Sequence, residues 1–316
     1  MSIAAEASPK QRLDIMRGGD KAAVARALAH LERAPEGSDT LALLDAAYAA
    51  PRAHVIGVTG PPGVGKSTLL GALVRAFRGQ GHSVGVIAVD PSSRRTGGAL
   101  LGDRVRLLTD PEDAGVFVRS MAARDRLGGL AEMTVAAMVL MRAVYDVVLI
   151  ETVGVGQSET DVAGVADTVL FCVQPGSGDS LQFMKAGIVE IPDVAVVTKA
   201  DMGRPARRAL VALKGALSLN AAGRDGWEVR ALTVSAQGTS GEAGEIDGLI
   251  QALDTHRDWL AEGDRLTRQR HRQSEQWLRE ALRDRHGRVG LARAGSLSLG
   301  PGESPFSRLA EIAARL

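Results

Sequence analysis

The chain has 316 residues, of which 45% are hydrophobic and 24% are charged, as expected for a globular protein with a full hydrophobic core. Its formal net charge of +1 gives no electrostatic reason to expect nucleic acid or a membrane as a partner. The single cysteine, Cys172, excludes an intramolecular disulfide framework, and neither a signal pattern nor an apolar run of membrane-spanning length is present, so we expect a cytoplasmic protein.

Residues 1–50 are predicted to form a helical extension. Apolar side chains recur at helical spacing at Val24 and Leu28, and again at Leu41 and Leu44. The turn-forming residues 35–38 separate these two segments. No residue here has an obvious chemical role, so we expect the extension to pack on the domain that follows.

Residues 51–255 alternate apolar runs of strand length with helical stretches. This alternation predicts an α/β fold with a doubly wound, mainly parallel sheet, in which strands buried on both faces are apolar throughout. Ligands of such folds bind at the carboxyl ends of the strands, so the polar residues after each strand are the candidates for chemistry. The predicted strands are Val55–Thr59, Val84–Val89, Val116–Arg119, Val147–Glu151, Thr168–Val173, Val194–Thr198 and Val229–Ser235.

The loop after the first predicted strand matches the phosphate-binding pattern G-x-x-x-x-G-K-S/T at Gly60–Ser67. Glycines let such a loop curl until its backbone N–H groups point at a phosphate, and the next helix adds its positive N-terminal end. Lys66 is expected to reach the outer phosphates, and the hydroxyl of Ser67 can bind Mg²⁺. The predicted nucleotide-binding residues of this loop are Gly60, Gly63, Val64, Gly65, Lys66, Ser67 and Thr68.

Carboxylates follow two further predicted strands. Residues 90–103 form a polar loop that begins with Asp90 and ends with Asp103, and we interpret it as a segment that meets a metal and the terminal phosphate. Glu151 ends an apolar strand, a position that suits Mg²⁺ or its water shell. The backbone of Gly154 is then placed to contact the terminal phosphate.

The stretch Thr198-Lys199-Ala200-Asp201 is similar to the guanine-recognition pattern N/T-K-x-D. The carboxylate of Asp201 can accept hydrogen bonds from the ring N–H and the exocyclic amine of guanine, a pairing that adenine cannot match, while the stem of Lys199 can lie along the base. Thr198 replaces the more usual asparagine, which weakens secondary contacts but keeps the carboxylate. The later stretch Ser235-Ala236-Gln237 fits the loop that closes over the base.

Residues 256–316 are predicted to form a helical arm. Trp277, Leu278 and Leu282 share one helical stripe, whereas residues 264–275 are almost wholly polar, with acidic and basic side chains at helical spacing. We interpret the polar stretch as a solvated helix face rather than an RNA-binding stripe. A long helix with so little apolar surface is expected to project from the domain and to bury its stripe in a partner.

Four stretches together resemble the MeaB/ArgK family of methylmalonyl-CoA mutase-associated GTPases: residues 60–68, 90–103, 151–159 and 198–201. The resemblance implies a P-loop GTPase that binds GTP, GDP and Mg²⁺ and hydrolyses GTP to GDP. It places Mg²⁺ among Ser67, Asp90, Asp103 and Glu151. Lys66, Asp90 and Glu151 are the catalytic residues that it implies.

The resemblance also implies partners. The C-terminal arm would form a homodimer, and residues 175–185 would transmit the nucleotide state to an adenosylcobalamin-dependent acyl-CoA mutase, which binds the cobalamin itself. GTP hydrolysis would then gate the loading and protection of that cofactor. Methylmalonyl-CoA mutase is the default partner, and mutases of related acyl-CoA substrates are the alternatives.

The reaction expected is phosphoryl transfer to water by positioning and charge neutralisation. Neither an arginine finger nor a water-orienting glutamine is assigned, because Gln157 lies too far beyond Glu151 to match the usual catalytic glutamine by position. We therefore expect a low intrinsic rate, with the mutase supplying the missing organisation.

Three other readings fit a phosphate loop. A metal-insertion GTPase typically has histidine-rich tracts or cysteine ligands, whereas this chain has 6 scattered histidines and 1 cysteine. A membrane-cycling partition ATPase usually has a second lysine where this chain has Pro61 and Pro62, and a small-molecule kinase would not need residues 198–201. Competition between GTP and ATP separates the last two readings from a GTPase.

Overall fold

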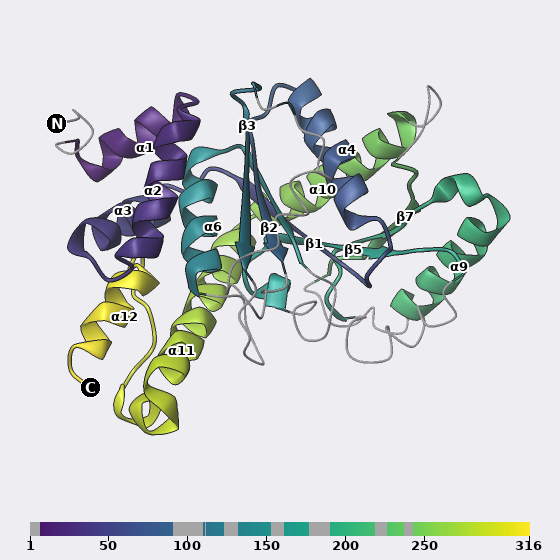
Figure 1. Cartoon of the computed structure of the whole chain (residues 1–316). Helices are drawn as coiled ribbons and strands as arrows, with labels where there is room; N and C mark the ends of the chain where they lie inside the picture. Colours follow the sequence, from purple (N-terminus) through teal and green to yellow (C-terminus); the bar gives the residue numbers. More distant parts are fainter. Residues whose placement is uncertain are drawn as a thin grey trace, which may run out of the picture.

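A seven-stranded parallel sheet forms the centre of the molecule (Figure 1). The computed structural model describes residues 7–90, 110, 112–122, 132–152, 161–176, 190–218, 226–236 and 243–316. Within these residues the strand order is β3-β2-β4-β1-β5-β6-β7, and every neighbouring pair is parallel. The carboxyl ends of all strands therefore lie at one edge of the sheet, where ligands of doubly wound folds bind.

All seven predicted strands are confirmed, with ends that move by a few residues. The main difference is at Asp90, which was predicted to open a loop but is the last residue of β2, because its backbone pairs with Ala122 in the adjacent strand. The strands are β1 (His54–Thr59), β2 (Val84–Asp90), β3 (Val116–Ala122), β4 (Val147–Glu151), β5 (Thr168–Val173), β6 (Val194–Val197) and β7 (Arg230–Thr233).

Helices cover both faces of the sheet. On one face, α4 (Lys66–Gly79) and α10 (Ala243–Ala261) pack over strand residues such as Ile56 and Leu149. On the other face, α6 (Glu132–Val144) packs over Val148 and Ile150, and α9 (Arg204–Ser218) covers the far end of the sheet. Successive residues of a central strand are thus buried on opposite faces, which explains the continuous apolar runs in the sequence.

The helical N-terminal extension lies on the outer side of α6 (Figure 1). It consists of α1 (Pro9–Arg17), α2 (Lys21–Arg33) and α3 (Ser38–Ala49), one helix more than the two predicted segments. The additional break is at Gly19, which has φ +93°, followed by Asp20, whose carboxylate accepts a hydrogen bond from the Ala23 N–H (2.8 Å) and caps α2. Leu13 of α1 is buried against the rest of the extension.

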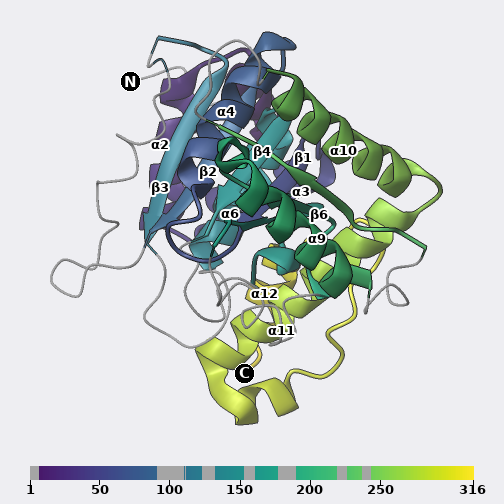
Figure 2. The ribbon, with the colours of Figure 1, turned by 90° about the vertical axis from the view of Figure 1, so that its right-hand side faces the viewer.

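The C-terminal arm folds back along the molecule (Figures 1 and 2). It comprises α11 (Arg265–Arg293), interrupted at Gly287 with φ +67°, and α12 (Pro305–Ala313), which packs on α3 and α11. The predicted stripe of Trp277, Leu278 and Leu282 is buried in the chain's own core. The arm therefore uses its apolar stripe within this chain, which corrects the expectation that the stripe is left for a partner.

The polar stretch at residues 264–275 is only partly solvated. Arg268 and Asp264 form the expected exposed pair (3.2 Å). Gln273, on the inner side, donates to the carbonyl oxygens of Ala163 and Ala166 (2.9 and 2.8 Å), which lie in and after the short helix η2 (Val162–Gly164). This half of α11 is thus attached to the central domain by polar contacts.

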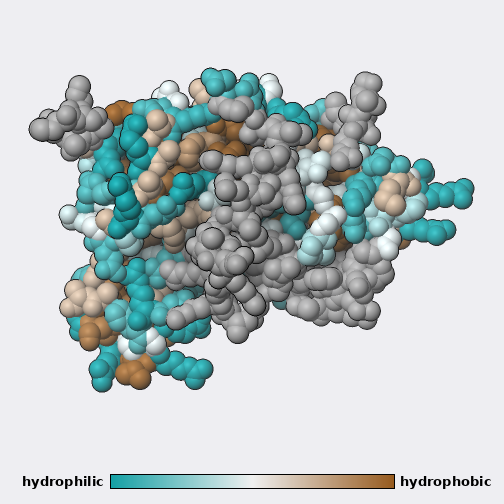
Figure 3. Space-filling model, in the orientation of Figure 1, coloured by the Kyte–Doolittle hydropathy of each residue, from teal (hydrophilic) through white to brown (hydrophobic). Residues whose placement is uncertain are grey.

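On the face shown in Figure 3, the described surface is mostly hydrophilic, with smaller hydrophobic areas between the hydrophilic ones. The large exposed apolar side chains, on several different elements, are Ile15, Met202, Val211, Val289 and Leu316. Isolated residues of this kind are normal on folded proteins. Among the described residues, no helix is both long enough and apolar enough to cross a lipid bilayer.

Candidate functional site

The phosphate loop connects the end of β1 to the start of α4 and depends on glycine. Gly60, Gly63 and Gly65 have φ of +138°, +75° and +96°, in the region that L side chains rarely adopt. A Cβ atom on Gly60 would lie 2.2 Å from the carbonyl oxygen of Cys172 in β5, whereas one on Gly63 or Gly65 would meet no atom within 4 Å. Gly60 is thus required by the adjacent strand, and the other two glycines leave open space around the loop.

Lys66 begins α4 and is buried. Its Nζ donates hydrogen bonds to the carbonyl oxygens of Gly60 (2.7 Å) and Pro61 (3.1 Å), so its ammonium group lies across the loop it belongs to. A phosphate bound in the loop would lie next to this ammonium group. The position agrees with the predicted role of Lys66 towards the outer phosphates.

Ser67 and Glu151 meet at the carboxyl edge of the sheet. The Ser67 hydroxyl donates to Oε1 of Glu151 (2.7 Å), and the carboxylate is buried. The contact arises because β4 lies beside β1 with Glu151 in register with Val58. A carboxylate and a hydroxyl are hard oxygen donors of the kind that Mg²⁺ prefers, so these residues fit the predicted metal.

The other predicted metal ligands are only partly placed. Asp90 ends β2 at the same edge of the sheet, because Ala88 of β2 is in register with Glu151. The Asp90 side chain, Asp103 and Gly154 lie outside the described residues. Within the described part of the chain, no group of three or more His, Cys, Asp or Glu side chains gathers as a metal cluster.

The predicted guanine-recognition residues lie next to the phosphate loop. The Thr198 hydroxyl, buried at the end of β6, donates to the carbonyl oxygen of Val64 in the loop (2.6 Å). Lys199 has φ +56°, and its Nζ donates to the carbonyl oxygen of Gly63 (3.3 Å) and to the side-chain oxygen of Gln174. Two adjacent residues thus tie the end of β6 to the loop.

Asp201 lies in the short helix η4 (Ala200–Met202) and is exposed. Its Oδ1 accepts a hydrogen bond from the Ser235 hydroxyl (3.1 Å), and the Ala200 N–H donates to the carbonyl oxygen of Val234 (3.3 Å). The Ser235 N–H in turn donates to the carboxylate of Glu245 in the first turn of α10 (2.7 Å). The two predicted base-binding segments are therefore side by side, with Ala236 next to Ser235 and Gln237 outside the described residues.

Sequence reasoning missed two contributors to this arrangement. Thr198 was regarded as a weakened asparagine, but its hydroxyl holds the phosphate loop. Glu245 was not considered, although its carboxylate holds the loop that carries Ser235. An acidic residue in the first turn of a helix is too common to have identified Glu245.

Cys172 is fully buried in β5, as expected for a small core residue. Burial raises the pKa of its thiol to about 12, with a smaller rise from Glu151 and an opposing effect of Lys66. The thiol therefore stays protonated at neutral pH and takes no part in the chemistry of the site.

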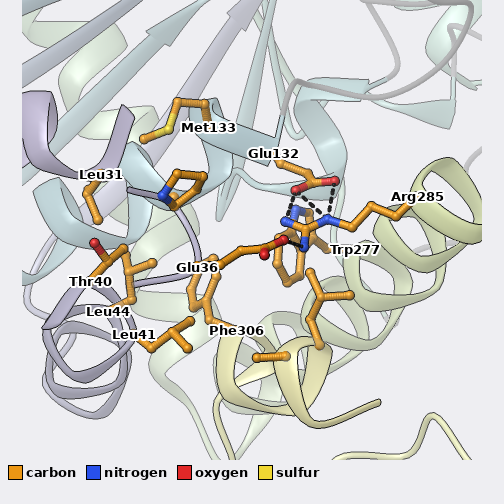
Figure 4. Close-up of a pocket in the computed structure, with 14 residues that line it drawn as sticks. Leu31, Glu36, Thr40, Leu41, Leu44, Glu132, Met133, Trp277, Arg285 and Phe306 are labelled. Atoms are coloured by element: carbon orange, nitrogen blue, oxygen red, sulfur yellow. Dashed lines mark hydrogen bonds and ion pairs between the residues drawn. The ribbon is translucent and has the colours of Figure 1, made fainter. Parts of the chain in front are cut away.

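A cavity of about 50 Å³ lies elsewhere, between the N-terminal extension, α6 and the C-terminal arm (Figure 4). It has an apolar lining that includes Leu44 and Phe306, and Arg285 at its edge bonds to Glu132 (2.5 Å) and Glu36 (2.6 Å). The hydrogen bonds to Glu132 raise the pKa of Arg285. No residue of the phosphate loop lines this cavity, so it is separate from the candidate site.

The sequence is similar to a family of known proteins over most of its length. A family model described as methylmalonyl Co-A mutase-associated GTPase MeaB matches residues 24–290. A putative GTPase of Pyrococcus horikoshii is 40% identical over 275 residues, which cover 85% of this chain and 84% of that protein. A Mus musculus protein named methylmalonic aciduria type A homolog, mitochondrial, is 39% identical over 230 residues, covering 71% of this chain and 54% of that protein.

The fold has a solved counterpart over its whole length. A structure described as that of an LAO/AO transport system kinase superimposes with a TM-score of 0.67 at 29% identity and covers 99% of both chains. The family match spans every described residue of the candidate site, from Gly60 to Ala236.

Proposed function

The chain belongs to the family of methylmalonyl-CoA mutase-associated GTPases and is a GTP hydrolase, and we propose that it serves as the chaperone of an adenosylcobalamin-dependent acyl-CoA mutase. The observation that carries the nucleotide chemistry is the meeting of the phosphate loop, Glu151 and residues 198–201 at one edge of the sheet. The family match carries the choice of partner. We further propose that the protein works in the cytoplasm.

The protein binds the phosphates of GTP through the backbone N–H groups of the glycine loop and the N-terminal end of α4. Lys66 exchanges its bonds to the loop carbonyl oxygens for bonds to the β- and γ-phosphates. Ser67 and Glu151, with Asp90 and Asp103, would hold Mg²⁺, which would supply positive charge against the phosphates.

Asp201 selects guanine. Its carboxylate accepts from the two N–H groups of the base, and the hydroxyl of Ser235 orients it. Hydrogen bonds to a charged group contribute about 1.5–3 kcal/mol each, so Asp201→Asn is expected to weaken GTP binding by roughly 10²- to 10⁴-fold. The same change should raise affinity for xanthosine triphosphate, because the new amide N–H can donate to the carbonyl group that replaces the amine of guanine. Equal GTP affinity of Asp201→Asn and wild type would contradict this assignment.

The test of the partner is GTP hydrolysis with and without a purified adenosylcobalamin-dependent mutase, with ATP in parallel. We expect slow turnover of GTP alone, acceleration by the mutase, and little turnover of ATP. The γ-phosphate should be released as free inorganic phosphate and should not be transferred to an added protein or metabolite. This result separates hydrolysis from a kinase reaction. If the isolated protein hydrolyses GTP at its full rate and no mutase changes that rate, the GTPase assignment stands but the chaperone role is contradicted.

Two other readings lose support. Membership of this family favours the mutase over metal insertion, and the tetrad at residues 198–201 favours guanine over the adenine of a partition ATPase. The metal-insertion hypothesis would gain support if nickel or a similar ion, rather than a mutase, stimulated GTP turnover.

We also propose that the protein dimerises through the C-terminal arm. Val289, beyond the break of α11, is 66% exposed, and Leu316 at the end of the chain is 39% exposed. Val289→Glu should therefore raise the monomer fraction measured by light scattering, whereas the same change at exposed Val211 of α9 should not. A wild-type protein that is monomeric at all concentrations would contradict the proposal.

A further inference from the structure

Arg142, in the last turn of α6, is a buried guanidinium group that forms no ion pair with a carboxylate of the described residues. Only 4% of the residue is exposed, and its Nε is buried without a hydrogen-bond partner. Its side chain forms no ion pair or hydrogen bond with any described residue, and its one polar contact is with the ring of Tyr48, 5.9 Å from the ring centre. Burying such a charge without compensation is costly, so the site calls for a further group.

Arg142 lies beside a small cavity in which a further group can bind. A cavity of about 20 Å³ is lined by Arg142, Arg270, Trp277 and Phe306. It lies where α3, α6, α11 and α12 come together, apart from the candidate site. A single water molecule needs about 10–15 Å³, so the cavity holds one small species.

The polar side chains around this cavity include two donors that have no hydrogen-bond partner. The indole N–H of Trp277 is, like Arg142 Nε, buried without a hydrogen-bond partner. The hydroxyls of Tyr48 and Ser274 are bonded to each other (3.1 Å), and Arg270 is paired with the carboxylate of Asp167 (2.6 Å). Two donors are thus left over, and no buried side-chain acceptor of the described lining lacks a partner.

The net charge of the lining also favours a negatively charged occupant. Arg142 and Arg270 together carry two positive charges against the one negative charge of Asp167, and Asp167 forms its ion pair with Arg270 rather than with Arg142. Burial, and to a smaller extent the charge of Arg270, lowers the pKa of Arg142 to about 10 against the opposing effects of Asp167 and Tyr48, so the group is still cationic at neutral pH. A water molecule would satisfy an N–H group but would leave the charge.

The neighbouring larger cavity provides the contrast (Figure 4). It shares Trp277 and Phe306 with the smaller one, but its own guanidinium, Arg285, bonds to Glu132 and Glu36. The fold therefore neutralises one arginine with its own carboxylates and leaves the other without one. We propose that the small cavity binds a monovalent anion of the halide class, such as chloride, through Arg142 and Trp277.

Such an anion would join three parts of the chain. Tyr48 belongs to the N-terminal extension, Arg142 to the central domain, and Trp277 to the C-terminal arm. Its binding stabilises the docking of both extensions on the domain, since an anion bound only by the folded state raises stability by mass action.

The test is thermal unfolding of the full-length, nucleotide-free protein in sodium chloride and in sodium gluconate at equal ionic strength and pH. Gluconate is too large for the cavity. With chloride about 100-fold above its Kd, the midpoint should rise by roughly 5–10 °C for the wild type. In Arg142→Met the difference between the two salts should vanish, and in Arg272→Met, at an exposed arginine of α11, it should remain.

Arg142→Met also carries a second expectation. In gluconate it should be at least as stable as the wild type, because an uncompensated buried charge has been replaced by an apolar side chain of similar length. If this variant fails to fold, the wild type still decides the question: crystals grown with bromide should show an anomalous peak beside Arg142 and Trp277. Equal midpoints of the wild type in the two salts, or a water molecule in the cavity with no bromide peak, would overturn the proposal.

Discussion

The attachment of the C-terminal arm can be tested by removing one side chain, Arg270. Its Nε and Nη2 donate to the two carboxylate oxygens of Asp167 (2.8 and 2.6 Å), and Nη2 also donates to the carbonyl oxygen of Ala53 (2.9 Å). Asp167 is 1% exposed and keeps a hydrogen bond from the Val55 N–H (2.8 Å). Arg270→Ala therefore leaves a buried carboxylate with one neutral donor, and with Arg142 as a neighbouring positive charge that forms no ion pair with it.

Breaking a buried ion pair in this way costs about 3–5 kcal/mol. The remaining Val55 N–H and the loss of repulsion between Arg270 and Arg142 place the expected cost near the lower end, about 3 kcal/mol. At about 2–4 °C per kcal/mol, the unfolding midpoint should fall by roughly 6–12 °C. Arg268→Ala, on the same helix, is the control: its pair with Asp264 is exposed and should contribute about 0.5 kcal/mol or less.

Because Asp167 can be protonated, the loss of stability in Arg270→Ala should depend on pH. Burial alone would raise the pKa of Asp167, but the hydrogen bonds and charge of Arg270 outweigh it, so the pKa is lowered in the folded wild type. The stability from this pair is therefore present above the unfolded pKa of about 3.9 and is lost as the pH falls below it. Without Arg270 the folded pKa is raised instead, so the deficit of the variant should shrink between pH 7 and pH 4.5.

The assay is urea denaturation followed by far-UV circular dichroism at both pH values. Adding Asp167→Asn to Arg270→Ala should recover about 1–2 kcal/mol at pH 7, because it removes the charge and keeps an acceptor for Val55. An Arg270→Ala variant within about 1 kcal/mol of the wild type at pH 7, like the Arg268→Ala control, would refute the reasoning.

Three further predictions concern the central domain. Gly60→Ala should lower GDP affinity at least tenfold in a fluorescent-nucleotide titration, because its Cβ would lie 2.2 Å from the Cys172 carbonyl oxygen; Gly79→Ala, with open space at the end of α4, should bind normally. Burial lowers the pKa of His54 from 6.5 to about 4, so its neutral form stabilises the fold fully above pH 6.5. About 3 kcal/mol of the free energy of unfolding should be lost as the pH falls towards 4, because the unfolded chain then binds a proton that the folded chain does not. A His54→Gln variant whose thermal midpoint fell as steeply with acid would contradict this. With a thiol pKa of about 12, Cys172 should react with iodoacetamide only after unfolding, and rapid labelling of the native protein at pH 8 would show that the site is more open than described.

Local sequence patterns determined much of this protein. The strands, the glycine loop and the residues after β6 could be predicted because strand periodicity and turn chemistry depend on near neighbours in the chain. The role of Cys172 in the core followed in the same way from the apolar run around it. The predicted solvated arm was less accurate, because composition does not reveal which polar side chains of a helix face the domain, as Gln273 does.

Tertiary structure decided which of these residues meet. Ser67 touches Glu151 because β4 inserts beside β1, and Thr198 reaches Val64 because β6 ends beside the loop. Both contacts join positions far apart in sequence, and strand order is not encoded in any local pattern. The buried charge of Arg142 has the same origin: its surroundings depend on which side chains four helices, distant in sequence, bring to one cavity, and only their packing settles that.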